Sequence, residues 1–247
     1  ATGSLIISII TERVKVGDAP ADFQRLAPSF TVSLQPWQEQ LFFLRLMYKS
    51  TFRTPTFNDL YYYRLGNRSL RPEKANEYNI GITWSKPFVS FLNYFSVTID
   101  GYYNDVTDKI VAFPTTYAWK MANYGKVRAT GIDATLAAAT SLSKNITLVI
   151  SGGYTFQKAI DLTDPTSKSY KDQLPYTPEH SGNVSAILEM PWVNVGYSIV
   201  GVSERYSMSQ NIPENRIDGY MEQTVNLSKD FSLKRCKLRL QTEIVIL

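Results

Sequence analysis

The stretch "KSTFRTPTFNDLYYYRLGNRSLRPEKANEYNIGITW", residues 49–84, combines the two features that decide the fold. Near its end, Tyr78, Ile80, Ile82 and Trp84 alternate with small or polar residues. This period of two predicts a β-strand with one apolar face. The residues before that strand form a long connection rich in tyrosine, arginine and proline. The chain therefore joins regular strands through a connection that is unusually aromatic and cationic.

The same alternation recurs along the whole chain, whereas helical periodicity is hard to find. Many of the predicted strands are longer than the usual globular strand of about five or six residues. A tilted strand needs about nine to eleven residues to cross a membrane. The pattern predicts about eleven strands, at 4–16, 29–36, 40–53, 76–86, 94–105, 129–141, 145–157, 182–190, 193–206, 217–231 and 237–247.

The connections between these strands alternate between short and long. If the strands run up and down in sequence order, every long connection lies at the same end of the sheet. A membrane barrel has short turns on its periplasmic side and long loops outside, whereas a Greek-key sandwich has no reason to sort its loops in this way. The predicted long connections are 17–28, 54–75, 106–128, 158–181 and 207–216.

Aromatic residues gather at the short turns, where a barrel wall meets the membrane interface. We expect them to form an aromatic girdle there. In lipid a spanning sheet must close on itself, because no backbone group can be left unpaired. An odd number of strands does not suit a single-chain bacterial barrel, so we expect a piece of a larger one. The aromatic residues near the short turns are Trp37, Phe88, Phe91, Tyr94 and Trp192.

Composition excludes several other classes of protein. The 247 residues carry a formal net charge of only +4, which does not predict a nucleic-acid surface. One cysteine, Cys236, and one histidine, His180, exclude a disulfide framework, a multi-cysteine zinc site and a two-histidine metal site within the chain. We find no constellation of catalytic groups and therefore predict no enzyme activity, no metal site and no cofactor. The aspartates of 158–181 are expected to be solvated rather than to bind calcium.

The opening stretch resembles the barrels of TonB-dependent outer-membrane receptors. Those barrels carry a block of the form "sFRaPtf.eLY" followed by "N..L+PE", which 50–61 and 66–75 match here. Two further blocks follow in the family's order. They are "FSVTIDGYYNDVTDKIV" at 95–111 and "NYGKVRATGIDATL" at 123–136.

The resemblance implies an all-β, antiparallel, up-and-down transmembrane β-barrel of 22 strands, filled by an N-terminal plug domain. Residues 1–247 would supply about 11 of those strands as the C-terminal portion, with the plug domain and the TonB box absent. The implied location is the bacterial outer membrane. The implied partners are outer-membrane lipid, a nutrient ligand, and the TonB complex through the missing N-terminal part.

The resemblance also implies a function, which is energised uptake of a bulky, scarce nutrient such as a ferric siderophore or cobalamin. Haem is disfavoured, because haem receptors of this family usually carry a histidine between the two boxes and residues 52–72 contain none. Aromatic faces and fixed cations at an extracellular mouth suit an anionic or planar ligand. The ligand-binding candidates are Tyr61, Tyr62, Tyr63, Arg64, Arg68, Tyr117 and Trp119.

Two alternatives remain open from the residues. The tyrosines could belong to a membrane girdle and the arginines could contact lipid headgroups, whereas Arg53, Pro55 and Glu73 are expected to be structural, with Arg53 and Glu73 paired inside the wall. The whole chain could instead be a soluble β-sandwich that binds a ligand or carbohydrate. That alternative predicts that the face of Tyr78, Ile80, Ile82 and Trp84 is buried against a second sheet.

Overall fold

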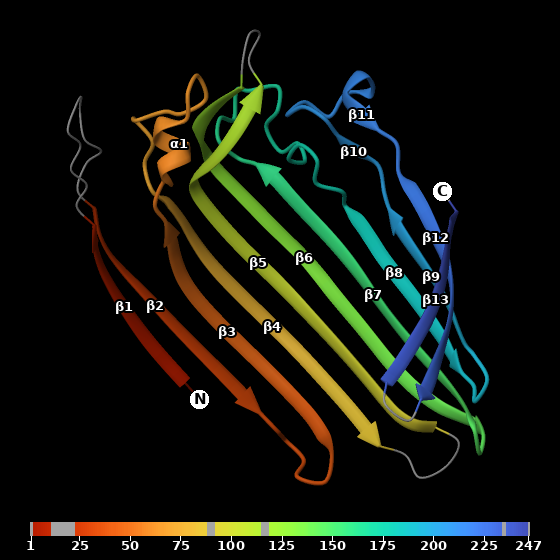
Figure 1. Ribbon diagram of the computed structural model, residues 1–247. Coiled ribbons are helices and arrows are strands. Elements are labelled where there is room, and N and C mark those ends of the chain that lie inside the picture. Colours follow the sequence, from red (N-terminus) through yellow and green to blue (C-terminus); the bar gives the residue numbers. More distant parts are fainter. Residues whose placement is uncertain (1, 11–22, 88–91, 115–118, 234–235, 247) are drawn as a thin grey trace.

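The computed structural model describes residues 2–10, 23–87, 92–114, 119–233 and 236–246, and it contains one large curved antiparallel sheet (Figure 1). Eleven strands form this sheet in the order β1-β2-β3-β4-β5-β6-β7-β8-β9-β12-β13. Their bounds are β1 Thr2–Ile10, β2 Phe23–Leu34, β3 Leu41–Arg53, β4 Glu73–Pro87, β5 Leu92–Pro114, β6 Trp119–Ser143, β7 Ile146–Asp161, β8 His180–Glu189, β9 Asn194–Val202, β12 Tyr220–Leu233 and β13 Cys236–Ile246.

Each strand of the large sheet pairs with the next one along the chain, apart from a small detour between β9 and β12. There, β10 (Arg205–Tyr206) and β11 (Arg216–Ile217) form a separate two-stranded sheet, and the 3-10 helix η1 (Pro213–Asn215) precedes β11. The α-helix α1 (Phe57–Tyr61) lies between β3 and β4. The predicted up-and-down antiparallel architecture is confirmed, and within the described residues β1 and β13 are the two edges of the sheet.

The described long connections β3–β4, β7–β8 and β9–β12 lie together at one end of the sheet, as predicted. Residues 17–22 of the connection predicted at 17–28 lie outside the described residues. Figure 1 shows α1, β10 and β11 at the upper end, while the turns β2–β3, β6–β7 and β8–β9 and the end of β12 lie at the lower end. At the lower end Trp37, Tyr94 and Trp192 leave 55%, 43% and 62% of their surface exposed. Phe88 and Phe91, expected beside them, lie outside the described residues.

The prediction of a long loop at 106–128 is wrong. β5 continues to Pro114 and β6 begins at Trp119, and their pairing runs without a register shift from Tyr94 with Ala139 to Pro114 with Trp119. The stretch contains Pro114, but each strand supplies the backbone partners of the other. The β5–β6 hairpin therefore rises well above the neighbouring strands.

Smaller boundary errors occur at the other elements. The strand predicted at 4–16 is described as far as Ile10, and its remainder lies outside the described residues. β2 begins at Phe23, six positions before the predicted 29. The strand predicted at 193–206 ends at Val202, because Arg205 and Tyr206 leave the large sheet to pair with β11. These differences change the strand lengths but not the strand order.

The apolar rows of successive strands all face the same side of the sheet. Leu44 pairs with Ile82, Ile82 with Ile99, and Ile99 with Ala134, and directly paired residues share a face. Tyr78, Ile80 and Ile82 are 48%, 53% and 40% exposed. No second sheet covers this face among the described residues, which contradicts the soluble β-sandwich. We call this side the outer face.

The opposite, inner face carries polar side chains bonded across strands. Arg45 donates to both carboxylate oxygens of Asp100, at 2.9 and 3.1 Å, across the intervening Gly81. Thr155 donates to Asp133 at 2.6 Å. Polar inside and apolar outside is the arrangement of a transmembrane barrel wall. Among the described residues, no helix is both long and apolar enough to cross a membrane.

Candidate functional site

The helix α1 in the β3–β4 connection is short but well anchored. Thr56 caps its N-terminus through a capping box, in which the Asp59 backbone N–H donates to the Thr56 hydroxyl at 3.2 Å and the Thr56 N–H donates to the Asp59 carboxylate at 2.8 Å. Leu60 at 3% exposure packs with Leu70 and Ile110 into a small buried cluster. The β3–β4 connection is thereby fixed against the β5–β6 hairpin.

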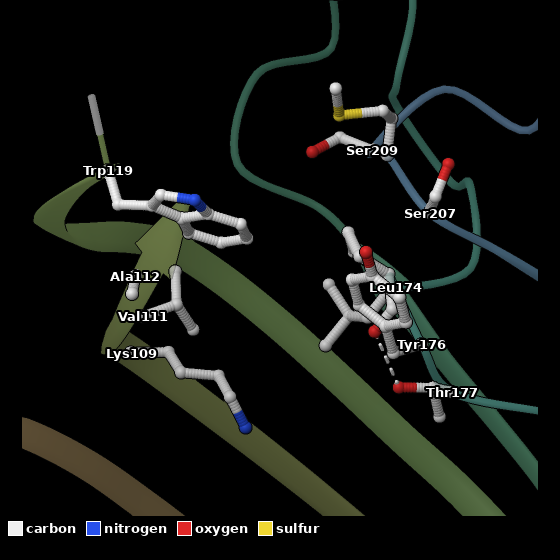
Figure 2. Close-up of a pocket in the computed structure, with 11 residues that line it drawn as sticks. Lys109, Val111, Ala112, Trp119, Leu174, Tyr176, Thr177, Ser207 and Ser209 are labelled. Atoms are coloured by element: carbon white, nitrogen blue, oxygen red, sulfur yellow. Dashed lines mark hydrogen bonds between the residues drawn. The ribbon is translucent and has the colours of Figure 1, made fainter. Parts of the chain in front are cut away.

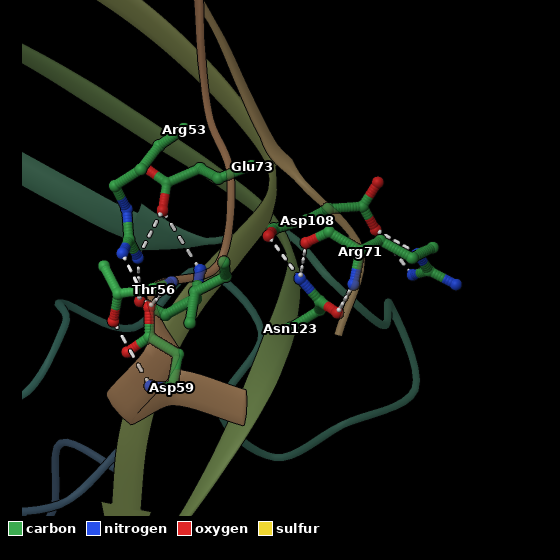
Figure 3. A network of polar contacts seen from close by, with 8 residues as sticks. Arg53, Thr56, Asp59, Arg71, Glu73, Asp108 and Asn123 are labelled. Carbon is green, nitrogen blue, oxygen red and sulfur yellow. Dashed lines mark hydrogen bonds and ion pairs between the residues drawn. The ribbon is translucent and has the colours of Figure 1, made fainter. Parts of the chain in front are cut away.

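A network around Arg53 holds this connection in place (Figure 3). Arg53 contacts Asp59 at 3.0 Å and Glu73 at 3.2 Å, and it also donates to the backbone carbonyl of Ile110 at 3.2 Å. Glu73 in turn accepts from the N–H of Ile110 at 3.1 Å. The predicted pairing of Arg53 with Glu73 is confirmed. The network links the end of β3, the start of α1, the start of β4 and the extended part of β5.

A second network of Figure 3 is centred on Asn123 in β6. Its side-chain oxygen accepts from the Arg71 N–H at 2.8 Å, and its amide nitrogen donates to the carbonyls of Arg71 at 2.9 Å and Asp108 at 2.6 Å. The Arg71 guanidinium pairs with the Asp108 carboxylate, with a distance of 2.9 Å from Nε. Asp108 has a positive φ of 55°, which these contacts hold in place.

The aromatic candidates of the β3–β4 connection divide into anchored and exposed residues. Tyr61 packs against the Leu60 cluster, and the Arg68 guanidinium lies 5.1 Å above its ring centroid, so both support the loop. Tyr62 and Tyr63 are 58% and 78% exposed. Arg64 has a φ of 63° and lies 5.2 Å from the Tyr63 ring centroid. Tyr62, Tyr63 and Arg64 therefore form a surface tip that is free for contact.

Of the two candidates on the β5–β6 hairpin, Tyr117 lies outside the described residues and Trp119 lines a cavity of about 280 Å³. Figure 2 shows the indole of Trp119 across the cavity from the loop that follows β7. The residues that sequence reasoning missed include one cation, one tyrosine and several hydroxyl groups. The lining is Lys109, Val111, Ala112, Trp119, Leu174, Pro175, Tyr176, Thr177, Ser207, Met208 and Ser209.

The structure does not join all the candidates in one pocket. Ile110 packs toward α1, whereas its neighbours Lys109 and Val111 line the cavity. No residue from Tyr61 to Arg68 lines the cavity. Tyr176 has a φ of 56°, which its N–H bond to the Tyr206 carbonyl at 2.7 Å helps to hold. No pattern in the sequence predicts the positive φ of Tyr176.

The aspartates of the β7–β8 connection stabilise the loop itself. Asp161 accepts from the Thr163 N–H at 2.8 Å, and Asp172 accepts from the Asn211 N–H at 3.0 Å. Hydrogen bonds from the N–H and hydroxyl of Thr166 lower the pKa of Asp164. Within the described ranges, no group of three histidine, cysteine or acidic side chains is placed to hold a metal ion.

His180 is the first residue of β8. Its Nδ1 lies 2.7 Å from the hydroxyl of Tyr154 on the neighbouring strand β7. Its ring is also 5.2 Å from the ring of Phe156. This histidine therefore has a structural partner within the wall.

Comparison with known proteins identifies the family to which this sheet belongs. The family model described as "TonB dependent receptor-like, beta-barrel" matches residues 10–242. The chain belongs to the TonB-dependent receptor family. It therefore forms part of a bacterial outer-membrane β-barrel. The blocks at 50–61, 66–75, 95–111 and 123–136 that carried the resemblance contain the residues of the Arg53 and Asn123 networks.

Two curated relatives of this TonB-dependent receptor chain are similar over a limited stretch. The "Vitamin B12 transporter BtuB" of Vibrio vulnificus is 36% identical over 84 residues, which are 33% of this chain and 13% of that protein. The protein of the same name from Photobacterium profundum is 29% identical over 97 residues, 37% of this chain and 15% of that protein. The similarity thus covers only a small part of each transporter.

Solved structures share the fold of the TonB-dependent receptor chain more completely. The ferric citrate transporter FecA in its unliganded form aligns with a TM-score of 0.69 at 15% identity, covering 90% of this chain and 33% of that chain. BauA, the ferric preacinetobactin receptor from Acinetobacter baumannii, aligns with a TM-score of 0.65 at 12% identity, covering 94% and 33%. At such identities the likeness shows the fold, and this chain spans about a third of either structure.

Proposed function

We propose that the chain is part of a receptor that takes up a bulky, scarce nutrient, a ferric siderophore or cobalamin, with energy from the TonB complex. The match of the receptor-barrel family model to residues 10–242 carries this proposal. The curated relatives are named as vitamin B12 transporters, and several structural neighbours are named as ferric-siderophore receptors or transporters. In this role the chain needs no enzyme chemistry of its own.

In the same proposal, residues 1–247 supply the C-terminal portion of the barrel, about 11 of 22 strands. The other strands, a plug domain and a TonB box would come from elsewhere in the full-length protein. The two edges of the sheet, β1 and β13, support this division, because a spanning sheet in lipid must be closed by further strands.

The ligand would meet the long-loop end at two places. One is the exposed tip formed by Tyr62, Tyr63 and Arg64, and the other is the cavity that Trp119 lines. The cavity combines the Lys109 ammonium with aromatic faces and hydroxyl groups, which suits a planar ligand that carries a negative charge. The left-handed backbone of Tyr176 supports this assignment, because strained residues cluster at binding sites.

Binding of radiolabelled cobalamin and of radiolabelled ferric siderophores to the full-length receptor tests the ligand class. We expect saturable binding of one class and not of the other. Failure of the receptor to bind either class would contradict the proposal that these nutrients are its ligands.

Substitution of Trp119 tests the cavity separately from the ligand class. We expect Trp119→Ala in the full-length receptor to weaken binding of the ligand roughly tenfold, since a lost aromatic contact of about 1.4 kcal/mol is a factor of ten. The matched control is Trp192→Ala, which removes a tryptophan of 62% exposure from the opposite end. If the parent receptor binds the ligand and Trp119→Ala leaves the dissociation constant unchanged, the cavity is not part of the ligand-binding site.

A further inference from the structure

The outer face carries a group of cations close to the long-loop end. Lys74 of β4 pairs with Thr107 of β5, and Thr107 pairs with Lys126 of β6, so both lysines share one face with Tyr78 and Ile132. The cations that share this face are Lys74, Lys126, Arg128 and Lys158, which we call the outer cation cluster. They come from three strands, β4, β6 and β7.

A row of tyrosines fixes the level of this cluster relative to the membrane. Tyr48, Tyr78 and Tyr103 pair in register on the outer face, with ring centroids 5.1 and 6.1 Å apart along the row. Tyrosines on a lipid-facing surface mark the headgroup level of a bilayer. Lys158 lies in the same register row, and Lys74, Lys126 and Arg128 lie farther toward the loops. The cluster therefore lies in this tyrosine row or beyond it on the side of the long loops.

The charge of the cluster is only partly balanced. Arg128 contacts Asp105 at 3.2 Å. The ion pairs of the described ranges include none of the three lysines, and both Lys126 and Lys158 are exposed. Glu73 and Glu77 of β4 face the other side, since they alternate with Lys74 and Tyr78. The outer face thus keeps an excess of positive charge at one place.

We propose that the outer cation cluster binds the phosphate-bearing headgroup of a lipid in the surrounding leaflet. Lysine and arginine side chains attract anionic headgroups, and a phosphate oxygen accepts charge-assisted hydrogen bonds from them. The long lysine stems lie along the apolar wall while their ammonium groups reach the interface. The site is on the opposite side of the wall from the Arg45–Asp100 pair, so it is independent of which nutrient the receptor carries.

The experiment compares two double variants of the full-length receptor in detergent micelles. Lys126→Gln with Lys158→Gln removes two cations of the cluster, and Lys144→Gln with Lys168→Gln removes two exposed lysines elsewhere, one in the β6–β7 turn and one in the β7–β8 connection. Native mass spectrometry then counts the phosphatidic acid retained against phosphatidylcholine. Circular dichroism and the unfolding midpoint show that both variants keep the barrel fold.

We expect the cluster variant to lose preference for phosphatidic acid by roughly 10- to 30-fold, since each lysine near a membrane surface contributes about fivefold. The control variant should keep the preference of the parent. Equal preference in the two variants would overturn the proposal. Displacement of the lipid by an equal concentration of inorganic phosphate would also overturn it, because the site would then bind free phosphate rather than a membrane lipid.

Discussion

Gly81 shows at the scale of one residue how the polar side of the sheet is built. It stands between Arg45 and Asp100 in one cross-strand row, and a Cβ at this position would overlap the Asp100 carboxylate and lie 3.0 Å from the Arg45 guanidinium. The missing side chain lets the arginine reach across a whole strand. In the sequence Gly81 is only one small residue in an alternating pattern, so this role could not be predicted.

We expect Gly81→Val to destabilise the barrel by about 1–3 kcal/mol, because overpacking would push the Asp100 carboxylate away from Arg45. The control is Gly101→Val on the next strand, where a Cβ meets nothing closer than 3.6 Å and which should be close to neutral. Urea unfolding of the full-length receptor in micelles, followed by tryptophan fluorescence, measures the difference. Similar midpoints for the two variants would show that the row tolerates a side chain.

Arg53 is the residue on which the β3–β4 connection depends most. Its side chain is 44% exposed, so solvent weakens each of its contacts. It nevertheless contacts the carboxylates of Asp59 and Glu73 and the carbonyl of Ile110 at the same time. We expect Arg53→Ala to cost about 1–2 kcal/mol and to speed amide exchange in α1. Arg239→Ala removes an exposed pair with Asp230 and should cost less than about 1 kcal/mol. Amide exchange in α1 that is the same in both variants would contradict this assignment.

At the scale of elements, the β5–β6 hairpin organises the long-loop end. It meets α1 through Ile110, and it lines the cavity with Lys109, Val111 and Trp119. The β7–β8 connection completes the cavity, and its turn at Asp164 is held by hydrogen bonds from Thr166 at 2.8 Å.

The turn at Asp164 should resist mild acid. Its hydrogen bonds lower the carboxyl pKa below the ordinary value of 3.8, so the stabilisation is fully present above pH 3.8 and is lost as the pH falls through the lowered value. We expect the Thr166 amide to stay protected from exchange at pH 3.8 in the parent. In Asp164→Asn the protection should be weaker and should not depend on pH in this range. Loss of protection already above pH 3.8 in the parent would contradict the lowered pKa.

At the scale of the whole molecule, the described residues form an open wall rather than a closed core. β1 and β13 are unpaired edges, and the outer face exposes large apolar side chains such as Leu26, Ile80 and Ile132. Exposed edges and apolar faces both favour association. The stability of the wall therefore depends on lipid and on further strands.

We expect residues 1–247 by themselves to fold only in detergent, with added barrel strands, or by association with another copy. Light scattering in dilute detergent-free buffer measures the mass of the chain, and the same measurement in micelles is the control. A stable monomer without detergent, with native strand content, would show that the wall closes or covers its apolar face in another way.

The sequence by itself determined the strand order, the family, and the end of the sheet at which the β3–β4, β7–β8 and β9–β12 connections lie. A period of two records which face of a strand meets apolar surroundings, and it does so residue by residue. The sequence also predicted the pairing of Arg53 with Glu73, because opposite charges were expected to pair inside the wall. Tyr61 and Arg68 were predicted at a ligand site, and the structure adds that Tyr61 packs against the Leu60 cluster with Arg68 above its ring.

Only the tertiary structure decided how the long-loop end is shaped. The height of the β5–β6 hairpin depends on backbone pairing between its two strands, and the cavity beside Trp119 depends on residues more than fifty positions away, such as Tyr176 and Ser207. The outer cation cluster likewise needs the register of three strands. Contacts between distant segments leave no local pattern in the sequence. The residue at each position must fit its own strand or loop, and that requirement does not show which distant residue it will contact.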